Sequence, residues 1–225
     1  ILIEDNEDKI SYEITKKNTD KDFKFSNLNI NSEINLSKLT YKNNFESIRK
    51  YFPEIRELIN FKNHKIKFNY SKDKTKITGS GQILIEDNED KISYEITKKN
   101  NQYFFKKVFE INQNILINEL QYKKEKNKKA SLKIDGILYA NKDIFLNQIS
   151  LLENDNIIFI KDLNLNNKFK ISDIGLLEID YKNNNKIHNQ IYLKKNKNYY
   201  TLEGDTFDAS KIINKIMEGE DDDSS

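Results

Sequence analysis

The chain has 225 residues, a formal net charge of +2, 33% charged residues and 36% hydrophobic residues. It contains no cysteine, which excludes a disulfide framework, a thiolate nucleophile and a thiolate metal site. Its Ile, Phe and Tyr residues alternate regularly with polar ones, which a disordered chain has no reason to do. We therefore expect a folded, β-rich chain that is long enough to bury a core.

The chain starts with a segment that occurs twice. The letters ILIEDNEDKISYEITKKN occupy residues 1–18 and return at residues 83–100. With a shift of 81, a weaker similarity continues from Leu28–Tyr41 onto Phe109–Tyr122. Two explanations stand: a duplicated structural module, and a chain composed of overlapping pieces. The first predicts that both copies form the same strands.

The repeat predicts two β units and a tail. The first unit covers residues 1–82 and contains a helix at about residues 45–60, where apolar residues follow helical spacing and Pro53 introduces a kink. The second unit covers residues 83–219. Residues 220–225 belong to an acidic, solvated tail.

Strand periodicity dominates both units. The letters KISYEIT place Ile92, Tyr94 and Ile96 on one side of a pleat and polar residues on the other. KIKFNY, SLKIDGILY, NIIFIKDLNLN, GLLEIDY and NQIYLKK alternate in the same way, and the polar clusters between them suit surface turns. Because parallel strands need long crossovers, this spacing predicts an antiparallel meander. The glycines of GSGQ, at residues 79–82, are expected in a turn or bulge.

A closing amphipathic helix is expected at about residues 208–218. Asp208 or Ser210 can cap it, and Gly219 is placed to end it. We expect its apolar stripe to dock onto the end of the sheet. The stripe consists of Ile212, Ile213, Ile216 and Met217. The predicted fold class is therefore mainly β: an extended, twisted antiparallel meander sheet that forms an open groove, with one or two short amphipathic helices.

No motif in the chain predicts catalysis or a cofactor. His64 and His188 lie in unrelated strand contexts, without the spacing of a metal-binding pair. The acidic runs EDNED and EDDD lack the residue order of a calcium loop. Lysines are interleaved with acids along the chain, whereas a nucleic-acid interface would gather them on one face. We therefore expect no enzyme activity, no metal, no cofactor and no nucleic-acid partner.

What remains is an extensive apolar surface on one side of the strands. Six glycines and one proline are few for turning corners, and only two short helices are available to cover the sheet. Two hypotheses follow: an open apolar groove, and a closed core of the kind expected in a structural or adhesive β-repeat protein. The candidate groove residues are Ile92, Tyr94, Ile96, Phe109, Ile111, Leu132, Ile134, Ile158 and Ile160.

The C-terminal part of the chain resembles a known family. The letters NQIYLKKNKNYYTLEGDTFDASKIINKI resemble the central region of the AsmA-like envelope proteins, in particular the YhdP type related to TamB. SLLENDNIIFIKDLNLNNKFKISDIGLLEIDY looks like the repeated strands of that region, and the pairing of YFPEIRELI with HKIKFNYSKDKTKITGSGQI is also similar. The resemblance covers most of residues 45–219. The identical duplication and the absence of an N-terminal membrane anchor depart from the family pattern.

This resemblance implies a function. Members of the family are similar to long, twisted β-grooves that span the Gram-negative periplasm, with an apolar interior proposed to carry phospholipid between the membranes. It implies that this chain is a non-enzymatic segment of such a lipid-transfer protein and contacts phospholipid acyl chains. It also implies a periplasmic location, with anchoring to the inner membrane through a segment not present in this chain. No catalytic residues come with the family.

Overall fold

The computed structural model describes residues 2–3, 8–16, 28–42, 49–85 and 89–217. They form a thirteen-stranded sheet and a two-stranded sheet. The large sheet contains β1 (Leu2–Ile3), β2 (Lys9–Lys16), β3 (Leu28–Lys42), β4 (Leu58–Ser71), β5 (Lys74–Leu84), β6 (Glu89–Lys99), β7 (Gln102–Ile111), β10 (Ala130–Leu138), β11 (Ile144–Glu153), β12 (Asn156–Leu165), β13 (Ile171–Lys182), β14 (His188–Lys195) and β15 (Tyr200–Thr206). The other elements are β8 (Ile115–Ile117), the 3-10 helix η2 (Asn118–Leu120), β9 (Tyr122–Lys124) and α2 (Ser210–Met217).

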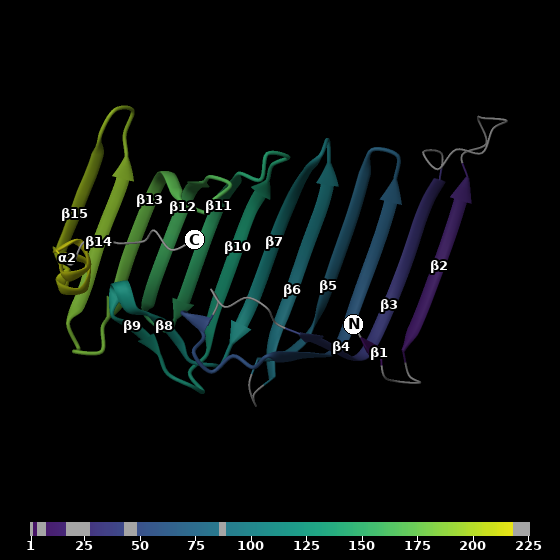
Figure 1. Cartoon of the computed structure of the whole chain (residues 1–225), viewed down its shortest axis with the longest axis horizontal. Helices are drawn as coiled ribbons and strands as arrows, with labels where there is room; N and C mark the ends of the chain where they lie inside the picture. Colours follow the sequence, from purple (N-terminus) through teal and green to yellow (C-terminus); the bar gives the residue numbers. More distant parts are fainter. Residues whose placement is uncertain (1, 4–7, 17–27, 43–48, 86–88, 218–225) are drawn as a thin grey trace.

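The large sheet is an antiparallel meander. From β2 onward each strand pairs with the next one along the chain, except where β8 and β9 leave the sheet between β7 and β10. β1 pairs with the far end of β3, in line with β2. β2 and β15 lie at opposite ends of the molecule, so the sheet stays open (Figure 1). The predicted fold class is therefore confirmed.

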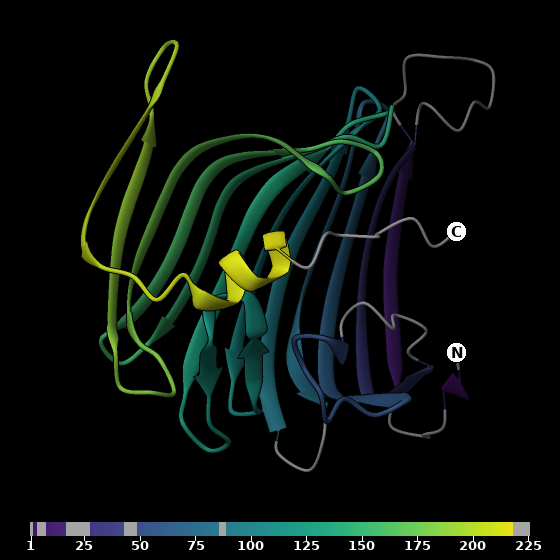
Figure 2. The ribbon, with the colours of Figure 1, turned by 60° about the vertical axis from the view of Figure 1, so that its left-hand side comes forward.

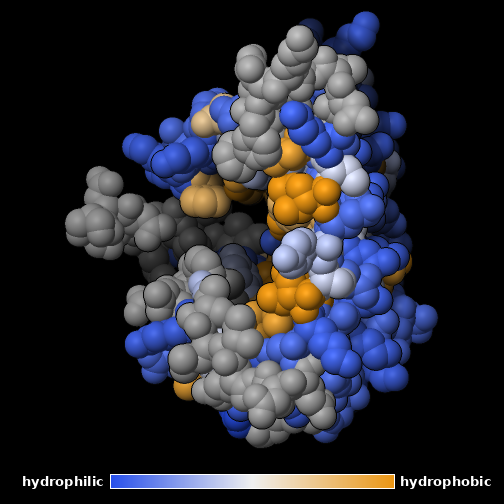
Figure 3. All heavy atoms as spheres, turned by 90° about the vertical axis from the view of Figure 1, so that its right-hand side faces the viewer, coloured by the Kyte–Doolittle hydropathy of each residue, from blue (hydrophilic) through white to orange (hydrophobic). Residues whose placement is uncertain are grey.

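The two faces of this sheet differ in polarity. On β6, Ile92, Tyr94 and Ile96 face one side, and Ser93 and Glu95 face the other. The apolar side is concave: the sheet curves into a trough, with α2 and the β8–β9 hairpin inside it (Figure 2). Seen from the β2 end, hydrophobic side chains gather along the wall of a hollow, and hydrophilic side chains cover the outer surface (Figure 3). The period-two pattern thus separates an apolar concave face from a polar convex face.

Irregular residues bend individual strands of the trough. The pairing of β4 with β5 shifts between Lys62 and Lys65, and Asn63 between them adopts a left-handed φ of 47°. On β12, Asp162 adopts a φ of 53°. Asn and Asp visit this conformation more readily than other residues with side chains. Such bulges bend a strand and increase its local twist, which curves the sheet.

The connection between β7 and β10 folds back onto the concave face. Tyr122 and Tyr181 are each 1% exposed, and their rings meet edge to face at 5.3 Å. The Tyr122 hydroxyl donates to Glu153 Oε2 at 2.7 Å, and the Tyr181 hydroxyl donates to the backbone oxygen of Leu120. We call the buried cluster beneath this connection the lower core. Its members are Ile111, Ile115, Tyr122, Ala130, Leu151, Ile158, Ile179 and Tyr181.

Buried polar groups hold the β8–β9 hairpin in place. Lys124 is fully buried, and its Nζ donates to the backbone oxygens of Gln113 at 2.5 Å and Glu125 at 3.1 Å. Asp90 is 1% exposed, and burial raises the pKa of its carboxyl although the amide of Asn112 donates to Oδ1 at 2.7 Å. Buried polar groups are costly unless they are hydrogen-bonded, so these contacts favour one position of the hairpin.

The predicted helix at residues 45–60 is wrong over its described part. Residues 45–48 lie outside the described residues, and Arg49 is helical. Residues 50–57 form turns and irregular chain, after which β4 begins at Leu58. A proline inside a helix removes a hydrogen bond and clashes with the preceding turn, so the sequence around Pro53 ends the helix instead of kinking it.

The apolar residues that suggested this helix form a second cluster. Ile55 and Ile59 are buried together with Ile83 and Ile85, and Phe52 packs against them. This cluster covers the lower ends of β4, β5 and β6. The helical spacing of these apolar residues therefore indicated that they are buried. They are buried by tertiary packing, without forming a helix.

The two copies of the repeat form the same strand in their second halves. Lys9–Lys16 is β2, and the identical Lys91–Lys98 lies within β6, as predicted. Their first halves differ. Leu2–Ile3 pairs with β3, whereas Ile83 pairs with Asp90 and makes a hairpin. Identical sequence takes two arrangements here because its neighbours differ.

Beyond the identical segment, the predicted shift of 81 is wrong. Lys9 lies opposite Asn35 on β3, and its copy Lys91 lies opposite Glu110 on β7. Structurally equivalent positions on β3 and β7 are therefore 75 residues apart. The difference arises because the connection at residues 17–27 is longer than the turn between β6 and β7.

The same offset of 75 relates two carboxylate contacts. The amide of Ser37 donates to Asp8 Oδ1 at 2.7 Å, and the amide of Asn112 donates to Asp90 Oδ1 at 2.7 Å. Asp8 and Asp90 are equivalent residues of the repeat. The β2–β3 pair is thus a structural copy of the β6–β7 pair. The sheet also runs through the predicted boundary between residues 82 and 83, which falls within β5.

α2 begins close to the predicted position. The amide of Ser210 donates to Asp208 Oδ1 at 3.2 Å, as expected of a cap. Asn183 Nδ2 donates to Asp208 Oδ2 at 3.1 Å, and the Asp208 amide donates to Asn189 Oδ1 at 2.7 Å. Ile213 is 50% exposed, so the prediction that its side chain is buried against the sheet is wrong. The side chains of Ile212, Ile216 and Met217 and the whole of residues 218–225 lie outside the described residues.

We predict that Tyr122→Phe destabilises the protein by about 1–3 kcal/mol, because it removes a donor from the buried Glu153 carboxylate. The free energy of unfolding, from urea titration, measures the loss. Tyr103→Phe is the matched control, since Tyr103 is 38% exposed. Equal effects of the two substitutions would show that the Tyr122 contact does not stabilise the lower core.

Candidate functional site

The concave face is organised in rows that cross the strands. The pairing registers connect one residue of each strand to one residue of the next, so a row runs along the trough. We call the row that reaches from β2 to β15 the middle row. It consists of Ile10, Ile34, Ile66, Gly79, Tyr94, Lys107, Ile134, Ile149, Ile160, Leu177, Leu193 and Leu202.

Two further rows flank the middle row. The upper row lies toward the tight turns and consists of Tyr12, Ser32, Phe68, Ile77, Ile96, Phe105, Gly136, Leu146, Leu163 and Ile174. The lower row lies toward the β8–β9 hairpin and consists of Gly81, Ile92, Phe109, Leu132, Leu151, Ile158, Ile179 and Ile191.

The chain itself closes the lower row. Leu151, Ile158 and Ile179 belong to the lower core, and Phe109 and Leu132 pack against it. The segment that covers them comes from the long connection between β7 and β10. This part of the concave face is therefore a dry core.

The β7–β10 connection does not cover the middle and upper rows, which we call the open rows; within the upper row Leu146 and Leu163 are nevertheless buried, at 8% and 5% exposed. Above them the strands end in short turns such as Lys72–Asp73 and Asn100–Asn101. Such turns are too short to fold over the face. Ile134, Ile149 and Ile160 are accordingly only half-buried. The open rows form an apolar strip along the trough.

All nine predicted groove residues lie on the concave face, but only some lie in the open rows. The open rows contain Tyr94, Ile96, Ile134 and Ile160. The lower row contains Ile92, Phe109, Leu132 and Ile158, and Ile111 lies beyond it, opposite Ala130. Ile111 and Ile158 are 2% and 6% exposed, so they serve the core and not an open groove.

Two glycines make room for an aromatic platform. A Cβ atom on Gly79 would lie 2.3 Å from the Tyr94 ring, and one on Gly81 would lie 2.3 Å from His64 Nδ1. The rings of Tyr94 and His64 stack at 5.7 Å, with an interplanar angle of 24°. GSGQ was expected in a turn or bulge, but it lies inside β5, and the bulge is on the neighbouring β4. The glycines are needed because the rings lie flat on the strand.

His64 is buried, and one of its two ring nitrogens lacks a partner within the described part of the chain. It is 3% exposed, and its Nδ1 has no hydrogen-bond partner among the described residues. Burial lowers the pKa of the imidazole, because the charged form loses its hydration. Burial therefore favours the uncharged imidazole at this position next to Tyr94.

Lys107 is the single charge in the middle row and was missed by sequence analysis. It lies between Tyr94 and Ile134 in the row, and its Nζ lies 5.8 Å from the centre of the Phe105 ring. No acidic side chain among the described residues forms an ion pair with it. Its alternation with Phe105 and Phe109 could have revealed this position, since all three share one parity.

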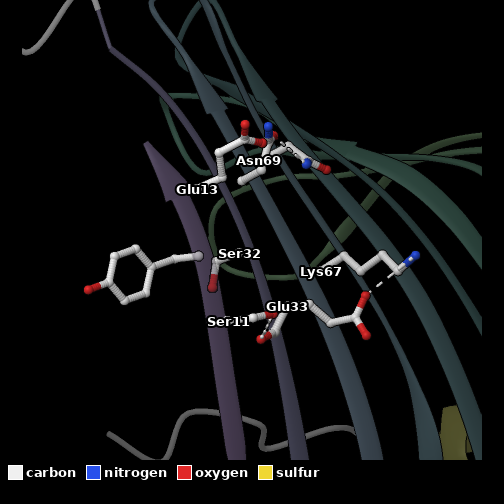
Figure 4. Close-up of a pocket in the computed structure, with 8 residues that line it drawn as sticks. Ser11, Glu13, Ser32, Glu33, Lys67 and Asn69 are labelled. Atoms are coloured by element: carbon white, nitrogen blue, oxygen red, sulfur yellow. Dashed lines mark hydrogen bonds and ion pairs between the residues drawn. The ribbon is translucent and has the colours of Figure 1, made fainter. Parts of the chain in front are cut away.

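Two pockets outside the trough are lined mainly by polar and charged side chains. One of 330 Å³ lies over β2, β3 and β4, where Glu33 and Lys67 point toward one another (Figure 4). Lys65 Nζ lies 2.6 Å from Glu33 Oε1, and this hydrogen bond lowers the pKa of Glu33. The Glu33 carboxylate in this pocket is therefore already paired with two lysines of the neighbouring strand, Lys65 and Lys67.

A second polar pocket, of 550 Å³, lies at the lower ends of β11 to β14. In it, His188 Nε2 lies 2.7 Å from Asp180 Oδ1 on the neighbouring strand. Within the described ranges, no three His, Asp or Glu side chains are grouped so that they could hold a metal ion. The described helices include none long and apolar enough to cross a membrane.

No protein-family model, curated protein or solved structure matches the chain. Its function must therefore be inferred from its own geometry. The feature used for this is the partly exposed apolar strip formed by the open rows.

We predict that Ile158→Asp destabilises the protein by several kcal/mol, whereas Ile160→Asp costs far less. The two residues are on the same strand and face, but Ile158 is buried under the hairpin and Ile160 lies in an open row. A carboxylate at position 160 can reach water. Thermal and urea unfolding of both variants measures the difference; equal losses would mean that the open rows are a closed core.

We predict that His64 makes the fold less stable at acid pH. Its folded pKa is lowered, so the unfolded state binds more protons, and stability falls as pH drops below the unfolded pKa of about 6.5. His64→Phe removes this term. The difference in unfolding free energy between wild type and His64→Phe should grow from about pH 7.5 to about pH 5.5; a constant difference contradicts the prediction.

Proposed function

We propose that the open rows bind phospholipid acyl chains, and that the chain is a non-enzymatic segment of a lipid-transfer protein. The observation that carries this proposal is the middle row, an almost unbroken line of apolar residues that crosses twelve strands and in which most side chains between β2 and β15 are only half-buried. At about 4.8 Å per strand, this row is about 50 Å long. A surface of this shape fits a long, thin apolar ligand.

The energetics favour an acyl chain as that ligand. Exposing about fifteen methylenes to water costs about 12 kcal/mol, at about 0.8 kcal/mol each. The same apolar side chains recur at every strand, so a bound chain meets a similar environment as it moves along the trough. Large barriers to sliding are therefore absent, and the polar head group stays in water at the open side.

Lys107 supports a phospholipid in preference to a neutral lipid. Its ammonium has no acidic partner among the described residues and stands within the apolar row. A phosphate beside it would gain a charge-assisted contact while the acyl chains lie on Ile134 and Ile149. The row thus offers both chemistries that a phospholipid requires.

The sequence resemblance supplies the cellular part of the proposal. We assign the chain to the YhdP type of AsmA-like proteins, in the periplasm, where it would move phospholipid between the inner and outer membranes. Contact with both membranes, and the anchor to the inner one, are assigned to regions outside these residues.

A structural or adhesive β-repeat protein is the second candidate. The observation that favours it is the lower core, where the same face is completely covered by the chain. On this alternative, the open rows also meet protein in the assembled molecule.

Photo-crosslinking distinguishes the two candidates. A photoreactive amino acid at Ile134 or Ile149, with vesicles of phosphatidylethanolamine and phosphatidylglycerol, should capture phospholipid. The same group at Lys133, on the convex face of β10, is the matched control and should capture little. Lys107→Glu should lower the capture of phosphatidylglycerol more than that of phosphatidylethanolamine, because the new carboxylate repels an anionic head group. If no open-row position captures lipid in folded protein, lipid binding is rejected and the structural candidate is favoured.

A further inference from the structure

Lysines gather at the upper end of two neighbouring hairpins in the interior of the sheet. The β4–β5 turn and the β6–β7 turn enclose a pocket of 310 Å³, and both hairpins have a paired strand on either side. Asn100, Asn101 and a single acid, Asp73, line this pocket together with four lysines. We call it the basic pocket, and its lysines are Lys72, Lys74, Lys98 and Lys99.

The lysines of the basic pocket differ from all other lysines of β4, β5 and β6. The others are each paired with a glutamate: Lys62 with Glu89, Lys65 and Lys67 with Glu33, Lys76 with Glu95, and Lys91 with Glu110. The four pocket lysines form no ion pair with an acidic side chain in the described ranges. Ammonium groups gathered in this way repel one another, and a bound anion relieves the repulsion. The basic pocket is therefore suited to an anionic ligand.

Lys98 connects the basic pocket to the concave face. It lies on the same side of β6 as Ile96 and Tyr94, and its Nζ is 5.4 Å from the centre of the Tyr103 ring on β7. The registers place it in a further row, directly above the upper row. Its neighbours in this row are Tyr70, Thr75, Tyr103, Leu138 and Ile144. Mainly apolar side chains thus lead from the open rows to the basic pocket.

This arrangement matches the two halves of an amphiphile. Tyr94, in the middle row, lies four residues below Lys98 along β6, which is about 13 Å. A phosphate in the basic pocket therefore leaves room for acyl chains on the upper and middle rows beside it. The four lysines are exposed, so an anion can bind them without the desolvation cost of a buried ion pair.

We propose that the basic pocket binds the phosphate of a phospholipid head group whose acyl chains lie on the open rows. The inference rests on the proposed function and adds to it a head-group site and a preference for anionic lipids. A zwitterionic head group carries its own ammonium, which the lysines repel. Four ammonium groups also attract an anion more strongly than Lys107 alone, so the basic pocket is the stronger of the two phosphate contacts.

Neutralising the pocket tests this preference. The pocket variant carries glutamine at its four lysines, which are all exposed. The control variant has the same change of net charge at exposed lysines elsewhere, through Lys123→Gln, Lys129→Gln, Lys133→Gln and Lys182→Gln. Each protein carries the photoreactive amino acid at Ile134 and meets vesicles of phosphatidylethanolamine and phosphatidylglycerol at about 0.15 M salt.

The ratio of captured phosphatidylglycerol to phosphatidylethanolamine should fall about three- to tenfold in the pocket variant, as expected for the loss of several exposed charge contacts. The control variant should keep the wild-type ratio. An equal fall in both variants overturns the proposal, because general charge attraction then explains the preference. An unchanged ratio in the pocket variant also overturns it, while lipid capture at Ile134 leaves the proposed function standing.

A soluble phosphate ester checks the pocket without lipid, since it carries the same chemical group. Titration with glycerol 3-phosphate should shift the backbone amide signals of Asn100 and Asn101 in the wild type and leave them unchanged in the pocket variant. Such shifts without lipid capture at any open-row position would assign the pocket to a soluble phosphate ester, which overturns the head-group assignment together with the proposed function. Lipid capture with neither a shift nor a changed ratio overturns the pocket alone.

Discussion

The alternation of apolar and polar residues along each strand is the constraint on which the rest of this structure depends. It gives the sheet one face that water disfavours, over an area that two short helices cannot cover. The chain solves half of this problem internally, since the β7–β10 connection and the segment around Ile55 bury the lower part of the face. The open rows are the half left over, and the lipid proposal concerns what covers that half.

The asymmetry between the two ends of the strands decides where cover is available. At the lower end the β3–β4 and β7–β10 connections are long, and the second carries the buried Lys124, whose hydrogen bonds allow only a narrow range of positions. At the upper end the turns between β4 and β5 and between β6 and β7 contain two residues each. A stable lower core thus supports an upper face that makes few contacts of its own, so binding there need not compete with folding.

Local periodicity predicted the antiparallel sheet and the shared face of all nine groove residues, because parity along a strand survives whatever its neighbours are. It could not predict which of them are covered. Ile158 and Ile160 look alike in sequence, and only a hairpin from residues 115–124 separates their surroundings. The helix at residues 45–60 and the shift of 81 failed for related reasons: helical spacing near Pro53 reflected burial, and the similarity beyond residue 100 ignored a change in connection length. The same alternation along the strand could have predicted that Lys107 lies on the concave face.

The correspondence between β2–β3 and β6–β7 has a consequence for how such a trough can evolve. A duplicated pair of strands keeps the direction of the chain and the side on which apolar residues fall. A single added strand would reverse the direction of the chain. Gene duplication in units of one hairpin therefore changes the length of the trough in steps of about 10 Å without altering its lining. The length of the trough would then change with the number of hairpins, while the chemistry of each step stays the same.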